Sequence, residues 1–240
     1  MDIALIGYGK MGRAIEAIAL ERGHRVVVTI DINNLDDFNR DNLQKTQVAI
    51  EFTSPKTAFG NIVRCLECGI PVVSGSTGWY GRLKEAEQIC TAQNGSMLCT
   101  SNFSLGVNIF FELNRVLAKL MNHFPDYRTE IEETHHTQKL DAPSGTAITL
   151  AEGIIGEIPR IGAWELDSNK PGTISVHSIR KESVPGTHNV KYTSEIDDIE
   201  IIHTAHSRKG LALGAVLAAE YIHNKKGIFS MKDLFNIASE

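Results

Sequence analysis

Long hydrophobic runs and an excess of basic residues are both absent from the sequence. The most apolar stretch, 211–222, carries Glu220 and falls short of the ~18 apolar residues that a membrane span needs. Lysine plus arginine number 24 against 29 acidic residues, a formal net charge of −5. This balance gives no electrostatic reason to bind nucleic acid or an anionic membrane, so we expect neither partner.

Cysteine is also scarce, and its four positions are Cys65, Cys68, Cys90 and Cys99. Four cysteines are too few for a disulfide scaffold and favour reduced thiols in a cytoplasmic protein. Cys65 and Cys68 form a C-x-x-C, but no second pair lies at zinc spacing, so we interpret them as small apolar residues on a helix and expect no metal. The N-terminal stretch has no basic region before its apolar residues, and we expect no signal peptide.

The 240 residues, 42% of them hydrophobic, are enough for one large domain or two smaller ones. Short apolar strands alternate with helical patterns over the first hundred residues, which predicts a parallel sheet covered on both faces. The expected strands are 3–6, 25–31, 48–53, 71–74 and 97–101, with a helix at 11–22 after the first of them.

The pattern changes near residue 104. A helix at 106–123, a strand at 127–139 and a helix at about 144–155 are followed by strands 173–180, 188–194 and 199–204 without a full helix between them. This spacing predicts a mixed or antiparallel sheet. A helix at 210–224 and a short amphipathic segment at 231–238 close the chain. We therefore predict an α/β fold with one domain at 1–104 plus 209–240 and an inserted α+β domain at 105–208.

The first expected strand runs directly into a glycine loop and then a helix. The loop reads Gly7-Tyr8-Gly9-Lys10-Met11-Gly12, a G-x-G-x-x-G in the strand–turn–helix context of a Rossmann-type dinucleotide site. Its glycines permit a tight turn, close approach of a pyrophosphate and close helix packing, while the helix N-terminus attracts the phosphates. A glycine turn that binds nothing is the alternative.

Asp31 ends the second strand, where a carboxylate accepts the ribose hydroxyls of NAD. An NADP site usually has an arginine just beyond this acid, but Ile32 and Asn33 follow here. NAD is therefore favoured over NADP, although Lys10 and Arg13 could still reach a 2′-phosphate. A simple turn residue is the other interpretation of Asp31.

The densest polar run spans residues 130–147 and holds two adjacent histidines. On a strand they point to opposite faces and cannot chelate one metal together, whereas His135, Thr137 and Lys139 share a face. A histidine beside a cation suits general acid–base chemistry. Residues 141–146 resemble a turn into a helix capped by Ser144 or Asp141, which makes a second anion site. An exposed polar strand followed by a capped helix remains the alternative.

These motifs resemble those of the dihydrodipicolinate reductase family over nearly the whole chain. The central motif is Glu133-x-His135-His136-x-x-Lys139-x-Asp141-Ala142-Pro143-Ser144-Gly145-Thr146-Ala147. Supporting motifs are the glycine loop, Phe52-Thr53, Gly75-Ser76-Thr77-Gly78, 102–108, Arg180, Gly186-x-His188 and His203-x-Ala205-x-x-Arg208. Glu51 departs from the aspartate that often precedes Phe-Thr in the family.

The resemblance implies NAD(P)H-dependent reduction of 4-hydroxy-tetrahydrodipicolinate to tetrahydrodipicolinate, with loss of water, in the diaminopimelate route of lysine biosynthesis. It implies His135 as a proton donor or acceptor and Lys139 as a second proton donor that also binds substrate. His136, Ser144, Gly145 and Thr146 are implied to bind the substrate carboxylates. The implied cofactor contacts beyond the glycine loop and Asp31 are Thr53, Gly75, Ser76, Thr77, Thr100, Ser101, Asn102 and Phe103. The inserted domain is implied to form a homotetramer.

Two other functions stay open on the residues alone. One is an amino-acid dehydrogenase of the aspartate or homoserine type, which would lack the central motif. The other is an NAD-sensing regulator, which would usually carry a basic DNA-binding element that this acidic chain does not show.

Overall fold

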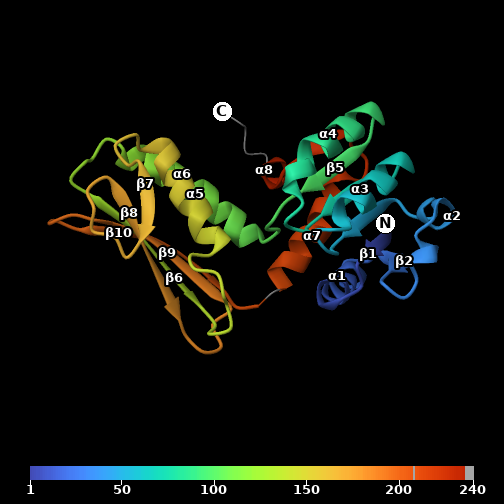
Figure 1. Cartoon of the computed structure of the whole chain (residues 1–240), viewed down its shortest axis with the longest axis horizontal. Coiled ribbons are helices and arrows are strands. Elements are labelled where there is room, and N and C mark those ends of the chain that lie inside the picture. Colours follow the sequence, from blue (N-terminus) through green and yellow to red (C-terminus); the bar gives the residue numbers. More distant parts are fainter. Residues whose placement is uncertain (208, 236–240) are drawn as a thin grey trace. The chain divides into compact units, whose positions relative to one another are not determined.

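The computed structural model describes residues 1–207 and 209–235, and the chain divides into two compact units (Figure 1). Unit 1 consists of Met1–Ser104 and Lys209–Glu240, and unit 2 of Leu105–Arg208. The expected fold class, a Rossmann-type α/β unit with an inserted mixed-sheet unit, is confirmed. The functional roles assigned to the two units stay predictions.

Unit 1 is built on a six-stranded sheet in the order β11-β5-β4-β3-β1-β2, with every neighbouring pair parallel. Its strands are β1 (Asp2–Ile6), β2 (Arg25–Ile30), β3 (Val48–Glu51), β4 (Val72–Ser74), β5 (Ser96–Cys99) and β11 (Gly227–Phe229). The central strands are short, apolar and buried along almost their whole length, because helices cover both faces of the sheet.

Helices α1 (Lys10–Glu21) and α7 (Lys209–Ile222) pack together on one face of this sheet, while α3 (Ala58–Glu67) and α4 (Leu83–Ala92) pack together on the other (Figure 1). The shorter elements are α2 (Arg40–Leu43), α8 (Met231–Leu234) and the 3₁₀ turns Leu35–Asp37 and Tyr80–Arg82. Helix α7 lies very close to the chain at Phe103, because a Cβ atom on Gly214 would come within 1.7 Å of the Phe103 carbonyl oxygen. The returning C-terminal helix is therefore part of the unit 1 core.

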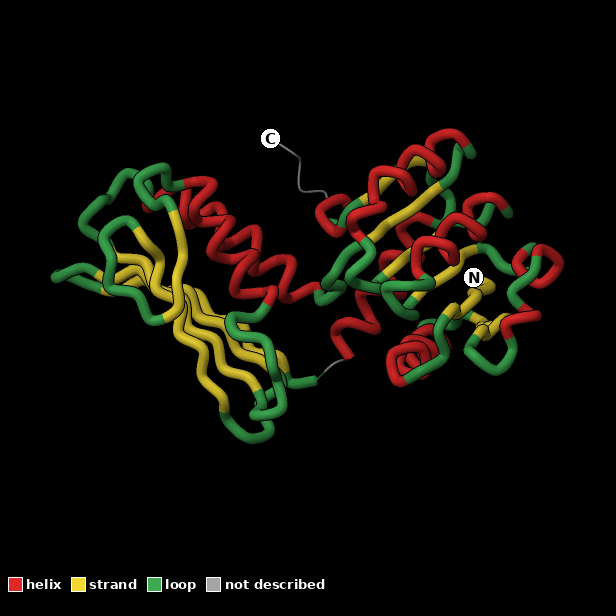
Figure 2. Tube along the Cα trace, in the orientation of Figure 1, coloured by secondary structure: helices red, strands yellow, loops and turns green. Residues whose placement is uncertain are grey.

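Unit 2 contains a five-stranded mixed sheet in the order β10-β9-β6-β8-β7 (Figure 2). Its strands are β6 (Arg128–His135), β7 (Ala163–Leu166), β8 (Thr173–Arg180), β9 (Gly186–Thr193) and β10 (Asp198–Ala205). Strand β6 pairs antiparallel with β9 and parallel with β8, so it occupies the centre of the sheet.

Helices α5 (Leu105–Met121) and α6 (Gly145–Glu157) pack against one another and over one face of this mixed sheet. Strand β6 shows the consequence, because its residues alternate between exposed and buried along the whole strand. Glu133 and His135 belong to the buried set, together with Thr129 and Ile131. Two ionisable side chains thus lie on the face that the core occupies.

The structure differs from the sequence predictions at strand ends and edges. The strand expected at 127–139 ends at His135, and the four-residue β7 and three-residue β11 were not predicted. The predicted segment 231–238 is helical only at Met231–Leu234, and its last residues lie outside the described part. Among the described residues no helix has both the length and the hydropathy that a bilayer span requires.

Candidate active site

The glycine loop of unit 1 has the geometry that a dinucleotide phosphate needs. Gly7 has a φ of +96°, and a Cβ atom there would lie 2.0 Å from the Phe52 carbonyl oxygen. A Cβ on Gly12 would lie 2.3 Å from the Gly7 carbonyl oxygen, whereas one on Gly9 would meet no atom within 4 Å. Helix α1 begins after Gly9 with no side-chain cap and no acidic residue in its first turn. Its first N–H groups are therefore available to an anion, and the loop fits a pyrophosphate.

Asp31 follows β2 in an ordered turn. Its Oδ1 accepts a hydrogen bond from the Asn33 N–H at 2.7 Å, and its own N–H donates to Asn34 Oδ1 at 2.7 Å. These bonds fix the carboxylate at the carboxyl end of the strand, where a ribose would lie in this fold. At the glycine loop, the Tyr8 hydroxyl donates to Glu16, and the Arg13 guanidinium lies 5.6 Å from the centre of the Tyr8 ring.

A buried carboxylate, Glu51 at the end of β3, connects two of the predicted cofactor residues. It is fully buried and accepts hydrogen bonds from the Thr53 N–H at 3.0 Å and from Ser76 Oγ at 2.9 Å, as well as from the Thr53 hydroxyl. Ser74 Oγ donates to its other oxygen at 2.5 Å. Glu51, which the sequence marked only as a departure from the family pattern, therefore holds the loops after β3 and β4 together.

The other predicted cofactor residues differ in exposure. Gly75 is required by packing, because a Cβ there would lie 2.2 Å from the Phe52 ring. The Phe103 side chain is buried, with its ring 5.7 Å from that of Phe52, so the backbone is the part of this residue that can face a ligand. Thr77 and Ser101 are exposed, and Thr100 and Asn102 are partly exposed beside them. The Asn102 N–H donates to Thr100 Oγ1 at 3.2 Å, which orders this segment.

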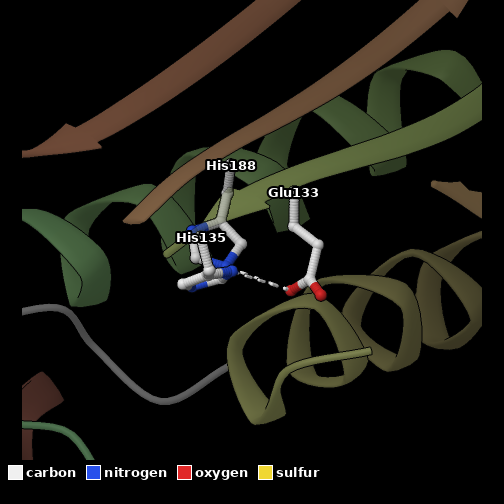
Figure 3. A group of neighbouring side chains, drawn as sticks. All are labelled: Glu133, His135 and His188. Atoms are coloured by element: carbon white, nitrogen blue, oxygen red, sulfur yellow. Dashed lines mark ion pairs between the residues drawn. The ribbon is translucent and has the colours of Figure 1, made fainter. Parts of the chain in front are cut away.

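In unit 2, three ionisable side chains from two neighbouring strands gather in the core (Figure 3). Glu133 and His135 come from β6 and His188 from β9, and they are 0%, 7% and 4% exposed. Glu133 Oε2 lies 3.6 Å from His135 Nδ1 and 3.7 Å from His188 Nε2. The two imidazole rings meet edge to face at 5.0 Å.

Glu133 also fixes the start of helix α6. Its two oxygens lie 3.1 and 3.0 Å from the Ser144 N–H, and Oε1 accepts from the Ser178 hydroxyl at 2.8 Å. Ser144 is the N-cap of α6, because its Oγ accepts from the Ala147 N–H at 3.2 Å. The same Oγ lies 3.1 Å from His188 Nε2. Of the two caps predicted, Ser144 is therefore the one used.

The environment sets the charges of this group. Burial acts to raise the pKa of Glu133, but hydrogen bonds from Ser144 and Ser178 outweigh it and lower the pKa below its usual range. Burial lowers the pKa of His135, against the opposing effect of the Glu133 carboxylate. Burial and the neighbouring His135 lower the pKa of His188 to about 4. At neutral pH an ionised carboxylate thus lies beside two neutral imidazoles.

Lys139 does not share a strand face with His135, contrary to the sequence prediction. Strand β6 ends at His135, and residues 136–139 form a turn in which the Lys139 N–H donates to the His136 carbonyl. Lys139 Nζ binds both oxygens of Asp141 at 2.9 and 2.8 Å, which lowers the pKa of Asp141. It still lies close enough to His135 to oppose protonation of that ring. The turn at residues 136–139, and not the strand, therefore brings Lys139 near His135.

Arg180, at the end of β8, holds this turn in place. Its NH2 donates to the Asp141 carbonyl at 2.7 Å, and its Nε donates to the Lys139 carbonyl at 3.4 Å. The predicted substrate residues Gly145 and Thr146 occupy the first turn of α6, and a Cβ on Gly145 would meet nothing within 4 Å. Their N–H groups have no acceptor within the helix, which makes this helix start suitable for a carboxylate. The predicted His136 is half-buried, with no hydrogen-bond partner at its buried Nδ1.

Glu133, His188, Ser178 and Arg180 were not assigned to the site from the sequence, although three of them lay in the quoted motifs. The period-2 pattern of β6, extended to Glu133, puts this acid on the face of His135. No spacing rule could connect β8 and β9 to that face. Of the later motif residues, His203 lies on β10 with its ring 5.9 Å from that of Phe110. Arg208 lies outside the described residues.

A parallel sheet with a glycine loop, joined to a mixed sheet with buried histidines beside a lysine, defines the class of two-domain nicotinamide-dependent oxidoreductases. Family models narrow this class. The family model described as "Dihydrodipicolinate reductase, N-terminus" matches residues 1–103. The model described as "Dihydrodipicolinate reductase, C-terminus" matches residues 106–235. The chain belongs to the dihydrodipicolinate reductase family.

Individual relatives agree with this assignment. The chain is 52% identical over 240 residues to the 4-hydroxy-tetrahydrodipicolinate reductase of Christiangramia forsetii, covering 98% of each chain. It is 31% identical over 230 residues to that of Neisseria meningitidis serogroup C, covering 92% of this chain and 84% of the relative. Among solved structures, the dipicolinate-bound dihydrodipicolinate reductase from Paenisporosarcina sp. TG-14 matches with a TM-score of 0.78 at 22% identity, covering 96% and 97% of the two chains. That last match supports the fold.

The Ser144 cap provides a test of how unit 2 is held together. We expect Ser144→Ala to lower the free energy of unfolding by about 1–2 kcal/mol, because the Ala147 N–H and His188 both lose a buried partner. Thr149→Ala, an exposed hydroxyl on the same helix, is the control and should change it by less than about 0.5 kcal/mol. Urea titrations followed by circular dichroism measure both. Equal stabilities for the two variants would contradict the capping role.

Proposed function

We propose that this chain reduces 4-hydroxy-tetrahydrodipicolinate to tetrahydrodipicolinate with NAD(P)H, with loss of water, in the diaminopimelate route of lysine biosynthesis. The observation that carries this proposal is the 52% identity over 98% of the chain to a relative of that name. The geometry of unit 2 supports it, since Glu133 joins buried His135 to a helix start suited to a carboxylate, and Lys139 acts on the same histidine.

The substrate carboxylates are bound in this proposal by unit 2. The N–H groups of Gly145 and Thr146 receive one carboxylate at the start of α6, supported by His136. Lys139 receives a carboxylate in exchange for Asp141, which is exposed and pairs with the lysine in this structure. Arg180 keeps the turn fixed through two carbonyl groups while this exchange takes place.

The protons are handled by His135 and Lys139. Loss of water at C4 and protonation of the reduced ring both need a general acid. Burial lowers the pKa of His135, so its ring is neutral at neutral pH, and the negative charge of a bound dicarboxylate acts to raise that pKa again. The ring is thus able to take up a proton as the substrate binds and to donate it during the reaction.

The cofactor residues belong to unit 1, and the family uses NAD(P)H. Gly7, Gly9 and Gly12 with the start of α1 would hold the pyrophosphate, and Asp31 the adenosine ribose. Thr53, Gly75–Thr77 and the backbone of 100–103 would hold the nicotinamide, with Glu51 fixing Thr53 and Ser76. When bound, the nicotinamide supplies the hydride. The cytoplasmic location expected from the reduced cysteines stays a prediction.

The homotetramer expected for the family is proposed to form through the mixed sheet of unit 2. In the described part of this unit, helices cover one sheet face, while Glu132, Asn189 and Ile202 lie in one row across the other face. Ile202 is 59% exposed on that row. A sheet with one uncovered face of this kind is suited to packing against a second sheet.

Two substitutions separate the roles of the proton-transfer residues. We expect His135→Gln to lower kcat by about 10²–10⁴-fold with a small change in KM, since it removes a positioned acid. Lys139→Ala should lower kcat and also raise KM by about 10–100-fold, since a charge-assisted contact is worth roughly 1.5–3 kcal/mol. Steady-state rates, with NADH affinity from calorimetry as the control, test this. Near-wild-type turnover of Lys139→Ala, or loss of NADH binding in either variant, would contradict the assignment.

Cofactor choice follows from Asp31. We expect kcat/KM with NADH to equal or exceed that with NADPH, because the carboxylate repels a 2′-phosphate. Asp31→Asn should shift the ratio toward NADPH, while Asp41→Asn, an exposed acid on α2, should leave it unchanged. A tenfold preference of the unmodified protein for NADPH would overturn this expectation and implicate Lys10 and Arg13.

The oligomeric interface has its own test. We expect the unmodified chain to sediment as a tetramer and Ile202→Glu to sediment as a smaller species, because a buried charge would destabilise the sheet interface. Leu120→Glu, on an exposed part of α5, is the control and should keep the tetramer. Dissociation by Leu120→Glu alone would place the interface on the helical side.

A further inference from the structure

We propose that Glu133 is a positioning residue, which holds His135 with its ring proton on Nδ1 and Ser144 at the start of α6. The inference deepens the proposed function, because it names the group that orients its acid–base histidine and its carboxylate-binding helix start. Glu133 itself is fully buried, and the proposal includes no contact between Glu133 and the substrate.

The tautomer follows from the surroundings of the His135 ring. Its Nδ1 is buried and has no hydrogen-bond partner in the described structure, and Glu133 Oε2 lies 3.6 Å from it. A carboxylate only accepts hydrogen bonds, so the proton is favoured on the nitrogen that faces it. The Nε2 atom is then the nitrogen that exchanges a proton with the substrate. Gly186 leaves room for it, because a Cβ there would lie 3.1 Å from His135 Nε2.

The same carboxylate fixes the position of the helix start. Both of its oxygens lie within 3.1 Å of the Ser144 N–H, and the Ser178 hydroxyl donates to one of them. The next two N–H groups along the chain, those of Gly145 and Thr146, are the ones that α6 presents to a carboxylate. Glu133 thus connects His135, the proton-transfer residue, to the anion site at the start of α6, which lies eleven residues further along the chain.

Charged and titratable groups from every side act on His135. Glu133 lies on its own strand, His188 on β9 and Arg180 on β8, while Lys139 and Asp141 lie in the turn that follows. His203 of β10 acts on His188. Glu133 and Asp141 favour the protonated ring, whereas Lys139 and Arg180 disfavour it. Glu133 is the only one of these that combines full burial with the ring's own strand face, so its removal should lower the pKa of His135.

A metal site at these three residues is the competing interpretation. The donor atoms of Glu133, His135 and His188 lie within 4.8 Å of one another. However, both Glu133 oxygens already accept a hydrogen bond from Ser144, and His188 Nε2 already pairs with the Ser144 hydroxyl. Zn²⁺ binding through His188 Nε2 would have to break its contact with the Ser144 hydroxyl.

Nitrogen NMR of the ligand-free chain tests the tautomer without requiring any activity. With ¹⁵N-labelled histidine and a chelator present, the His135 signals, assigned by their loss in His135→Gln, should show Nδ1 protonated and Nε2 unprotonated. Glu133→Gln should weaken that preference and lower the pKa of His135 by about one unit. Glu132→Gln, the neighbouring acid on the opposite face of β6, is the matched control and should change neither.

An Nε2–H tautomer in the unmodified chain would overturn the inference, and this result needs no variant to fold. An unchanged tautomer and pKa in folded Glu133→Gln would overturn it as well, because a merely structural role lowers stability alone. A switch of His135 to the Nε2–H tautomer when Zn²⁺ replaces the chelator would favour the metal interpretation and count against the inference, because a metal on the nitrogen that faces Glu133 excludes the proton from it.

Kinetics supply the second readout. Glu133→Gln should lower kcat about 10–100-fold with a smaller effect on KM, since it impairs but does not remove a general acid. The limb of the pH profile that disappears in His135→Gln should move to lower pH, and Glu133→Asp should restore part of it. If the unmodified chain does not turn over the proposed substrate, the proposed function fails, while the NMR result still decides the role of Glu133.

Discussion

Burying an ionised carboxylate costs several kcal/mol unless donors surround it, and Glu133 meets that cost with bonds from the Ser144 N–H and the Ser178 hydroxyl. The consequence extends beyond the acid itself. Ser144 is the cap of α6 and the partner of His188, so the helix start is fixed by the same bonds that keep Glu133 ionised. His135 then lies against a fixed negative charge.

Unit 1 also contains a buried acid surrounded by hydrogen-bond donors, Glu51. This acid also lies at the end of a central strand, is fully buried and collects donors from two loops, through Thr53, Ser74 and Ser76. In each unit a buried acid therefore orders the loops that carry the predicted ligand contacts. Neither acid needs to touch a ligand for this. Each acts by fixing the positions of other residues that are predicted to bind one.

How far the sequence could predict the molecule depends on how local each signal is. The glycine loop was predictable because its turn, close approach and following helix are all encoded within a dozen residues, and Gly7 shows the required positive φ. The parallel sheet followed from short apolar strands that helices bury on both sides. Strands β7 and β11 were not predicted, because four and three residues at a sheet edge are too few to show a hydrophobic period.

The site shows the same limit. A period of two correctly puts Glu133 and His135 on one face, but nothing in it reveals that the strand ends at His135, so Lys139 was misplaced onto that face. The contacts of His188, Ser178 and Arg180 depend on the pairing of β6 with β8 and β9, which brings residues far apart in sequence together. Such pairing is a tertiary property, so only the resemblance to a family pointed toward His188 and Arg180, and nothing in the sequence pointed toward Ser178.

The electrostatic state of unit 2 follows from these contacts. The Arg180 guanidinium is bound to two backbone carbonyl groups and lies 3.6 Å from the ionised Glu133, whereas Lys139 is paired with a carboxylate at the surface. Its present partner, Asp141, is exposed, so exchanging it for a substrate carboxylate costs little desolvation. The buried Glu133 carboxylate is thus a fixed part of the site, and the Lys139–Asp141 ion pair at the surface is the part that rearranges. Within residues 133–141, Glu133 therefore fixes the geometry, while Lys139 is free to exchange Asp141 for a substrate carboxylate.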